Sequence, residues 1–429
     1  MPMSDAARVA CLSRAFLSSW RYHPNLTLDA KTLCMKASRG KFRRKVDNIL
    51  TNHSGTVKIL KLNVEDEYNT FHYIDRWLQV ADTPGIEELT LTLYKKYSFP
   101  CSLLSDGVRA SIRCFELHSC AFHPMADLGS LRRLTNLALN SVHFTGDELE
   151  CLLSNSVVLE QLSLHDCNKI RFLKIPSVLK QLSYLNVIAC WRLKEIVCEA
   201  PNMSDITLYR SIRLSLGEPL KMKRLCLGRW NVVCYARAEL PSIMPNLEIM
   251  TLSSGSEAVN VPMLPTKFLY LKHLTIQMTQ ENLTPSNDYF SLVSFLDASP
   301  SLETLFPTFE AAARAVEHNH DCLKSVEIIG FSSAKCLVEL TCCIVKTAAS
   351  LERLTLDTLR GGYDRCSGES NKICCPVSEA VLKEAPRAVV AAQRFIEDKV
   401  APTTKLNLLG PCARCHSIDG PYAKLCVVP

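Results

Sequence analysis

A short pattern of apolar positions recurs along most of the chain. It consists of an apolar residue, two variable residues, a Leu-x-Leu pair or a close equivalent, two further residues, and a cysteine or another apolar residue. The clearest copies span residues 112–120, 134–142, 159–167 and 182–190. Because successive side chains of a β-strand point to opposite faces, each pair predicts a short strand with both apolar side chains on one face.

The pattern continues on both sides of these copies and defines a repeat. With the four clear copies there are thirteen centres between residues 60 and 354. They are about 24.5 residues apart on average, with single steps of about 19 to 31, which is typical of leucine-rich repeats. We therefore expect an α/β leucine-rich-repeat solenoid with a curved parallel sheet inside and helices outside. The weaker copies centre on Leu60, Leu89, Ile206, Leu225, Met250, Leu274, Leu305, Val326 and Leu354.

Helical periodicity fills several of the segments between the predicted strands. Residues 147–153 form such a segment, and Thr145 and Glu148 have the Thr-x-x-Glu spacing of a capping box at its start. Residues 292–296 and 337–344 have a similar apolar spacing before the next predicted strands. Each repeat is therefore predicted to run strand, turn, helix.

Cysteine is abundant in this sequence, with 21 residues. Cys120, Cys167 and Cys190 occupy the last position of the repeat, where a small apolar side chain fits and its S–H group can donate to a buried carbonyl. No apolar signal segment and no apolar run of 18 or more residues is present, so we expect reduced thiols and a cytoplasmic or nuclear protein, not a membrane protein.

Composition narrows the range of functions. The chain has 429 residues, of which 47% are hydrophobic, so a mostly disordered protein is excluded. The 15 glycines are few for phosphate-binding loops, and the net charge of +6 does not demand a nucleic-acid partner. Without a Walker loop, a Gly-x-Ser-x-Gly elbow or a His-Glu-x-x-His motif, we expect neither an enzyme nor a cofactor.

The two ends of the chain differ from the repeats. Residues 29–56 read as a helical linker or cap, whose six basic residues between 36 and 45 are either a solvated helix face or a nuclear signal. Residues 361–429 read as a loop, a helix over 379–400 with a break or new start at Pro386, and a cysteine-containing tail.

One motif in the tail has metal-ligand spacing. Cys412, Cys415 and His416 are weak candidates for a zinc site, because a structural site needs four ligands and only one well-spaced pair is present. The main expectation is therefore that no metal is bound. A metal-dependent or redox enzyme that uses these cysteines remains an alternative.

Side chains that flank the leucines of each pair point to the opposite face of the predicted sheet. In solenoids that concave face commonly binds partners. The predicted set is mostly neutral polar and lacks lysine, so it favours a protein client over nucleic acid. Its members are Glu116, His118, Asn136, Asn140, Gln161, His165, Tyr184, Asn186, Tyr209 and Arg224.

The start of the chain, at residues 1–28, resembles the second half of an F-box. The resemblance rests on Pro2, residues 5–8 and 11–14, Phe16 and Trp20, followed by Pro24, Leu26 and Leu28. It points to the plant F-box proteins with leucine-rich repeats. It implies that Pro2, Leu12, Phe16 and Trp20 contact a Skp-family adaptor, and that the first half of the motif, with its Leu-Pro pair, is missing.

The C-terminal third resembles the FBD-like end of the same proteins, at residues 317–321, 323–327, 330–331, 337–340, 350–356 and 411–416. The resemblance implies the substrate-recognition subunit of an SCF-type ubiquitin ligase, which docks on the adaptor and cullin complex and holds a client. The alternative is an interaction scaffold without ligase coupling. The predicted division is a partial F-box over 1–28, a linker over 29–56, repeats over 57–360 with FBD-like features from about 317, and a tail over 361–429.

Overall fold

The chain divides into two compact units, Met1–Lys221 and Met222–Pro429. The computed structural model describes residues 21–33, 41–64, 71–81, 84–93, 97–124, 128–217, 219–254, 266–278, 295–308, 320–359 and 379–412. None of the helices in these ranges is both long and apolar enough to cross a membrane.

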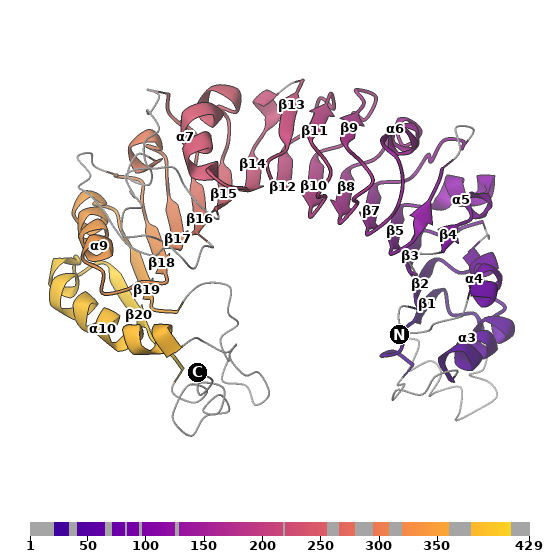
Figure 1. Ribbon diagram of the computed structural model, residues 1–429, viewed down its shortest axis with the longest axis horizontal. Helices are drawn as coiled ribbons and strands as arrows, with labels where there is room; N and C mark the ends of the chain where they lie inside the picture. Colours follow the sequence, from indigo (N-terminus) through magenta and orange to yellow (C-terminus); the bar gives the residue numbers. More distant parts are fainter. Residues whose placement is uncertain are drawn as a thin grey trace. The chain divides into compact units, whose positions relative to one another are not determined.

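The first unit contains a parallel sheet in which each strand pairs with the next repeat's strand (Figure 1). The register aligns one buried row, Leu26, Leu60, Leu89, Phe115, Leu137, Leu162, Leu185 and Ile206. The predicted centres are therefore confirmed as structural equivalents. The strands are β1 (Asn25–Leu28), β2 (Ile59–Asn63), β3 (Glu88–Thr92), β5 (Cys114–His118), β7 (Asn136–Asn140), β8 (Gln161–His165), β10 (Tyr184–Ile188) and β12 (Asp205–Tyr209).

The second unit repeats this arrangement. Its register aligns Leu225, Met250, Leu274, Leu305, Val326, Leu354 and Leu406, and the first six of these are predicted centres. The fold is thus an α/β leucine-rich-repeat solenoid, as predicted. The strands are β14 (Arg224–Gly228), β15 (Ile249–Ser254), β16 (His273–Met278), β17 (Thr304–Thr308), β18 (Ser325–Ile329), β19 (Arg353–Asp357) and β20 (Lys405–Leu409).

The sheet strands extend beyond the predicted repeats at both ends. β1 lies within the segment that resembles an F-box, and β20 lies in the predicted tail. Both carry a Leu-x-Leu pair, and Leu26 and Leu28 of β1 are buried. An unusually long step separates Leu26 from the predicted centre at Leu60, and another separates the predicted centre at Leu354 from Leu406. Spacing alone therefore does not identify these two strands. The domain boundaries at residues 28, 56 and 360 stay a prediction.

Helices form part of the outer layer. In α6 the predicted capping box is present: the Thr145 hydroxyl accepts from the Glu148 N–H at 3.2 Å, and the Thr145 N–H donates to the Glu148 carboxylate at 2.6 Å. The helices are α3 (Lys41–Asn52), α4 (Phe71–Leu78), α5 (Asp106–Ser111), α6 (Gly146–Ser154), α7 (Val232–Ile243), α9 (Lys335–Thr347) and α10 (Glu379–Phe395), with 3-10 turns η2 (Gln79–Ala81), η3 (Cys101–Leu103), η4 (Pro219–Lys221) and η5 (Glu397–Lys399).

Two helix predictions in the second unit have clear outcomes. The segment 337–344 lies inside α9, as predicted. The break at Pro386 is wrong, because α10 continues through this residue. Ala385, Ala388 and Ala392 bury one side of α10, and this packing outweighs the backbone hydrogen bond that proline cannot make. Of the predicted segment 292–296, residues 292–294 lie outside the described residues.

The expectation of a helix in every repeat is also wrong. Short strands replace helices in the outer layer after β8, β10 and β12, and they form a second parallel sheet of β9 (Phe172–Ile175), β11 (Glu195–Cys198) and β13 (Arg213–Leu216). A further pair, β4 (Ser98–Phe99) and β6 (Ala121–Phe122), lies beside β5. The repeats that follow β8, β10 and β12 are short, and a strand spans a given distance with fewer residues than a helix does.

A left-handed turn follows several strands of the first unit. Ser119, Ser141, Asp166 and Ala189 directly follow β5, β7, β8 and β10, with φ between 51° and 55°. The residue after each of them is buried: Cys120, Val142, Cys167 and Cys190. Cys167 Sγ donates to the Leu139 carbonyl at 3.3 Å, which confirms the predicted role of this position. Burial raises the pKa of the Cys120 thiol to about 12.

Candidate functional site

The candidate site is the face of the first unit's sheet opposite its buried leucines, which we call the polar face. Three rows of side chains cross it, because equivalent residues of neighbouring strands lie side by side. Most of these side chains are half-buried, as expected for short polar groups packed against their neighbours. The middle row is Lys61, Thr90, Glu116, Ala138, Ser163, Asn186 and Thr207.

The other two rows contain most of the remaining predicted residues. Asn136, Gln161 and Tyr184 are consecutive in the row at the start of the strands, followed by Asp205. His118, Asn140 and His165 are consecutive in the row at their ends, followed by Ile188. The register thus brings together residues that lie in successive repeats of the sequence.

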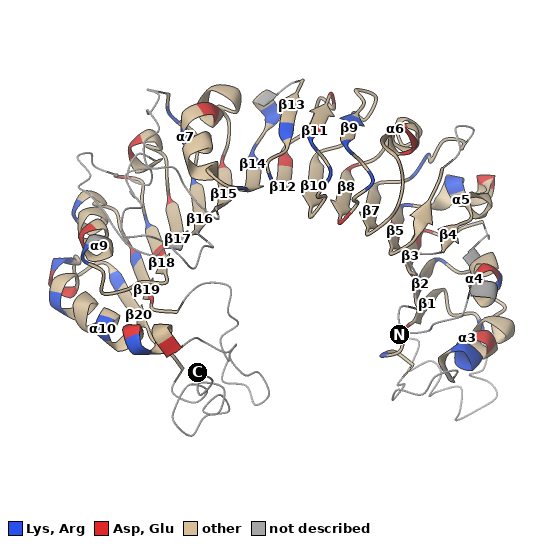
Figure 2. Cartoon of the chain, viewed as in Figure 1, with Lys and Arg blue, Asp and Glu red and all other residues tan. Residues whose placement is uncertain are grey.

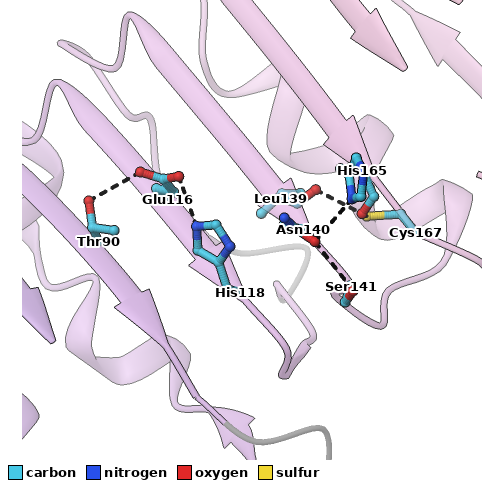
Figure 3. Close-up of polar contacts among 8 residues, drawn as sticks. All are labelled: Thr90, Glu116, His118, Leu139, Asn140, Ser141, His165 and Cys167. Carbon is cyan, nitrogen blue, oxygen red and sulfur yellow. Dashed lines mark hydrogen bonds and ion pairs between the residues drawn. The ribbon is translucent and has the colours of Figure 1, made fainter. Parts of the chain in front are cut away.

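Glu116 is the centre of one polar cluster on this face (Figure 3). Its Oε1 lies 2.8 Å from His118 Nε2, and its Oε2 accepts from the Thr90 hydroxyl at 3.3 Å. The hydrogen bond with His118 lowers the pKa of the Glu116 carboxyl from its ordinary value. Side chains of two neighbouring strands therefore hold one carboxylate in a fixed position, ready to accept from a partner's donor.

A second cluster lies further along the same face. His165 Nδ1 is 3.2 Å from Asn140 Oδ1, which also accepts from the Ser141 hydroxyl at 3.3 Å (Figure 3). Ser141 donates in addition to Asp166 Oδ2 at 2.7 Å. His165 is exposed, and its ring is held by Asn140. This cluster offers an oriented imidazole beside an amide group.

β10 and β12 complete the polar face with two half-buried tyrosines, Tyr184 and Tyr209. Between them, Asn186 Oδ1 is buried and has no hydrogen-bond partner among the described residues. A buried amide oxygen without a donor costs free energy, and a donor from a bound partner would remove that cost.

The remaining predicted residues do not belong to the strands of the first unit. Arg224 belongs to β14 in the second unit. Cys412 is half-buried, and in the part of the chain that the structure describes no group of three or more metal-ligating side chains occurs. The other candidates for adaptor and metal binding lie outside the described residues: Pro2, Leu12, Phe16, Trp20, Cys415 and His416.

Several polar-face residues were not among the predicted ones. Lys61, Thr90 and Asp205 lie in the same rows but come from the weaker copies of the repeat. Lys61 Nζ is 3.8 Å from Glu88 Oε2, so the expectation of a lysine-free face is wrong for the strands before β5. The alternation around Leu60, Leu89 and Ile206 contains the signal that identifies these residues.

Comparison with known proteins gives a family match over most of the chain. Residues 49–413 match the plant-type family described as "At1g61320/AtMIF1, LRR domain". No curated protein matches the chain. A leucine-rich-repeat protein of Leptospira interrogans is 13% identical with a TM-score of 0.36, covering 92% of this chain and 98% of that one. An internalin of Listeria monocytogenes is 12% identical with a TM-score of 0.30, covering 75% and 90%.

Proposed function

Since this chain belongs to the At1g61320/AtMIF1 leucine-rich-repeat family, we propose that it binds a protein client on the polar face of its first unit. A protein-interaction scaffold is the general function that the family and the fold support. The observation that carries the proposal is the set of side chains whose positions are already fixed by hydrogen bonds on this face, at Glu116, His118, Asn140 and His165. Pre-positioned groups lose little conformational entropy when a partner binds.

The chemistry of the face defines the kind of client surface that fits it. The Glu116 carboxylate and the buried Asn186 Oδ1 can accept hydrogen bonds, while Tyr184 and Tyr209 supply half-buried aromatic contact area. Tyrosine is a frequent anchor in protein interfaces. The client segment should therefore present hydrogen-bond donors between apolar side chains.

We further propose that the chain acts as the substrate-recognition subunit of an SCF-type ubiquitin ligase, in the cytoplasm or nucleus. The support for this step is the resemblance of residues 1–28 to part of an F-box and of the C-terminal third to an FBD-like region. The chain would be non-enzymatic and would bring the client to the adaptor and cullin complex, whose other subunits transfer ubiquitin.

One observation favours the alternative of a scaffold without ligase coupling. Leu26 and Leu28, which belong to the segment that resembles an F-box, are buried in β1 and paired with β2. These two side chains are therefore unavailable for an adaptor. An adaptor contact would have to depend on residues before β1, among them Leu12, Phe16 and Trp20.

The ligase proposal is tested by co-precipitation of a purified plant Skp-family adaptor with the full 429-residue chain. We expect binding, and at least a tenfold loss in the Trp20→Ala variant, since aromatic anchors dominate interfaces (about 2 kcal/mol or more). The matched control is Trp230→Ala, a 75% exposed tryptophan of the second unit. No binding by the full chain would leave the scaffold without ligase coupling.

The client proposal is tested separately from the adaptor. Proteins that co-purify with the wild-type chain are compared with those of a Tyr184→Ala/Asn186→Ala variant and of a Lys335→Ala control on α9. A client of the polar face is retained by wild type and control and depleted about tenfold or more by the double variant. Equal recovery by all three folded proteins would contradict the proposal.

A further inference from the structure

A second surface of the first unit carries a concentration of positive charge. It is formed by the turns that lead from β8, β10 and β12 into the outer strands β9, β11 and β13 (Figure 2). We call it the basic turn surface. All six of its basic residues are exposed: Lys169, Arg171, Arg192, Lys194, Arg210 and Arg213.

The outer sheet keeps these residues close together. The Lys194 N–H donates to the Arg171 carbonyl at 2.9 Å, and the Arg213 N–H donates to the Lys194 carbonyl at 2.9 Å. Neighbouring strands are about 4.8 Å apart, so the three basic positions form a staggered row on adjacent strands, in which Arg213 is in register with Glu195 and not with Lys194. The short repeats create this row, because their outer segments are strands.

Few ion pairs compensate this row. Arg213 lies 3.9 Å from Glu195, whereas none of the other five basic residues forms an ion pair within the described ranges. Like charges this close repel one another. An anionic partner would relieve that repulsion.

An exposed aromatic ring lies in the middle of the surface. Trp191 is 57% exposed, and the Arg210 guanidinium carbon lies 3.7 Å from the centre of its ring. The backbone N–H of Trp191 donates to Asn168 Oδ1 at 2.6 Å, and the Asn168 side-chain amide donates to Asp166. The tryptophan is thus fixed by its turn, and it holds the Arg210 guanidinium in place through a cation–π contact.

The backbone at Arg210 is strained. Its φ of 141° lies in a region that glycine adopts far more readily than any other residue. A non-glycine residue is strained in this conformation. An arginine in such a position suggests that its side chain has a function which offsets the strain.

We propose that the basic turn surface binds an acidic peptide segment of a partner protein, with Arg210 as its central carboxylate-binding group. A guanidinium held flat by an aromatic ring can bind a carboxylate with two parallel hydrogen bonds. An extended peptide places alternate side chains about 6.6 Å apart, within reach of cationic side chains on adjacent strands. This proposal does not depend on a ligase function.

An acidic peptide fits the surface better than nucleic acid does. Single-stranded nucleic acid needs open aromatic faces on which bases stack, and Arg210 covers one face of Trp191. Carboxylates separated by neutral residues do not need an open ring face.

The first test measures binding of a fluorescent peptide of about ten residues, with Asp and Glu alternating with Gly and Ser, to the full chain by fluorescence anisotropy. We expect binding that weakens with salt and is absent for the matching Asn/Gln peptide. The Arg192→Gln/Lys194→Gln variant should bind about tenfold more weakly. The control, Lys335→Gln on an exposed position of α9, should bind as wild type does.

The second test separates binding from folding. Arg210→Gly removes the side chain and also the backbone strain, so we expect an unchanged or higher melting temperature together with at least threefold weaker peptide binding. Unchanged affinity in this folded variant would overturn the proposal. So would equal binding of the neutral peptide, or tighter binding of a single-stranded oligonucleotide of the same charge.

Discussion

Two regions of the first unit have inner strands of the same kind but different outer layers. Between β7 and β8, where the step from Leu137 to Leu162 is long, the outer layer contains helix α6. After β8 and β10, where the steps from Leu162 to Leu185 and on to Ile206 are successively shorter, it contains the strands β9 and β11. The inner sheet is continuous across both regions, so repeat length determines only the outer layer.

The physical reason is the rise per residue. The nine residues of α6 span about 13.5 Å at 1.5 Å per residue, and the four residues of β9 span about 13 Å at 3.3 Å per residue. A shorter repeat can therefore cover its inner strand only with an outer strand. Earlier in the unit, the long step before β3 contains α4, the long step before β5 contains both the two-residue strand β4 and α5, and the shorter step between β5 and β7 contains β6.

The largest expected effects concern the inner leucines that both regions share. Leu137 and Leu185 are 1% and 0% exposed, so Leu137→Ala and Leu185→Ala should each lower the free energy of unfolding by about 2–5 kcal/mol. Chemical denaturation of the two variants measures this. Because both side chains are fully buried, we expect both losses to fall within this range. A loss well below about 1 kcal/mol for Leu185→Ala alone would mean that outer strands pack less tightly than helices.

The next effect is specific to the helix-covered region. Glu150 lies inside α6, and Glu150→Pro removes a backbone donor and introduces a clash, at a cost of about 3 kcal/mol. Glu150→Ala is the matched control, since it removes only the half-exposed ion pair with Lys174, which contributes at most about 1 kcal/mol. Thermal melting of both variants tests this. A proline variant as stable as the alanine control would show that α6 is dispensable.

The inner strands could be predicted from the sequence because their signal is local and repeated. The predicted apolar centres align in register within each unit, and buried Cys167 and Cys190 lie one residue after a left-handed turn. The sequence of the outer strands also has the alternation that predicts a strand. In β9 the buried residues Leu173 and Ile175 alternate with more exposed ones, and in β11 Ile196 and Cys198 do the same. A helix in every repeat is the wrong inference because the shorter repeats leave too few residues for a helix to span the outer layer.

The contacts of the polar face could be predicted only in part. Alternation places Glu116, His118, Asn140 and His165 on the correct face, but it does not determine which of them are bonded. The pairing of Asn140 with His165 depends on strand register, and the lack of a donor to Asn186 Oδ1 among the described residues depends on what surrounds it in three dimensions. Short-range periodicity contains neither kind of information.

A smaller effect concerns the turn after an inner strand. Ala189 has a φ of 54°, and this conformation costs a non-glycine residue about 1–2 kcal/mol. Replacing alanine by glycine removes that strain, but the greater chain entropy of glycine in the unfolded state cancels about 0.5–1 kcal/mol of the gain. We expect Ala189→Gly to raise the free energy of unfolding by about 0.5–1 kcal/mol. The control is Ser141→Gly after β7, where the same relief is offset by the lost hydrogen bonds of the Ser141 hydroxyl to Asp166 and Asn140. Equal stabilisation of both variants would mean that these hydrogen bonds contribute nothing.

The smallest effect tests whether the polar face contributes to stability at all. The hydrogen bond with His118 lowers the pKa of Glu116 from its ordinary value of 4.5. The folded protein therefore binds fewer protons than the unfolded chain between the two pKa values. The stabilisation is present above pH 4.5 and is lost as the pH falls through the folded-state pKa.

Because the Glu116 side chain is 41% exposed, solvent screening limits the contribution of its hydrogen bond to about 0.5 kcal/mol or less. Unfolding of wild type and Glu116→Gln should thus differ slightly at about pH 7 and converge as the pH falls through the folded-state pKa of Glu116. A difference that grows as the pH falls would have the opposite sign, and would mean that the fold favours the protonated Glu116 carboxyl.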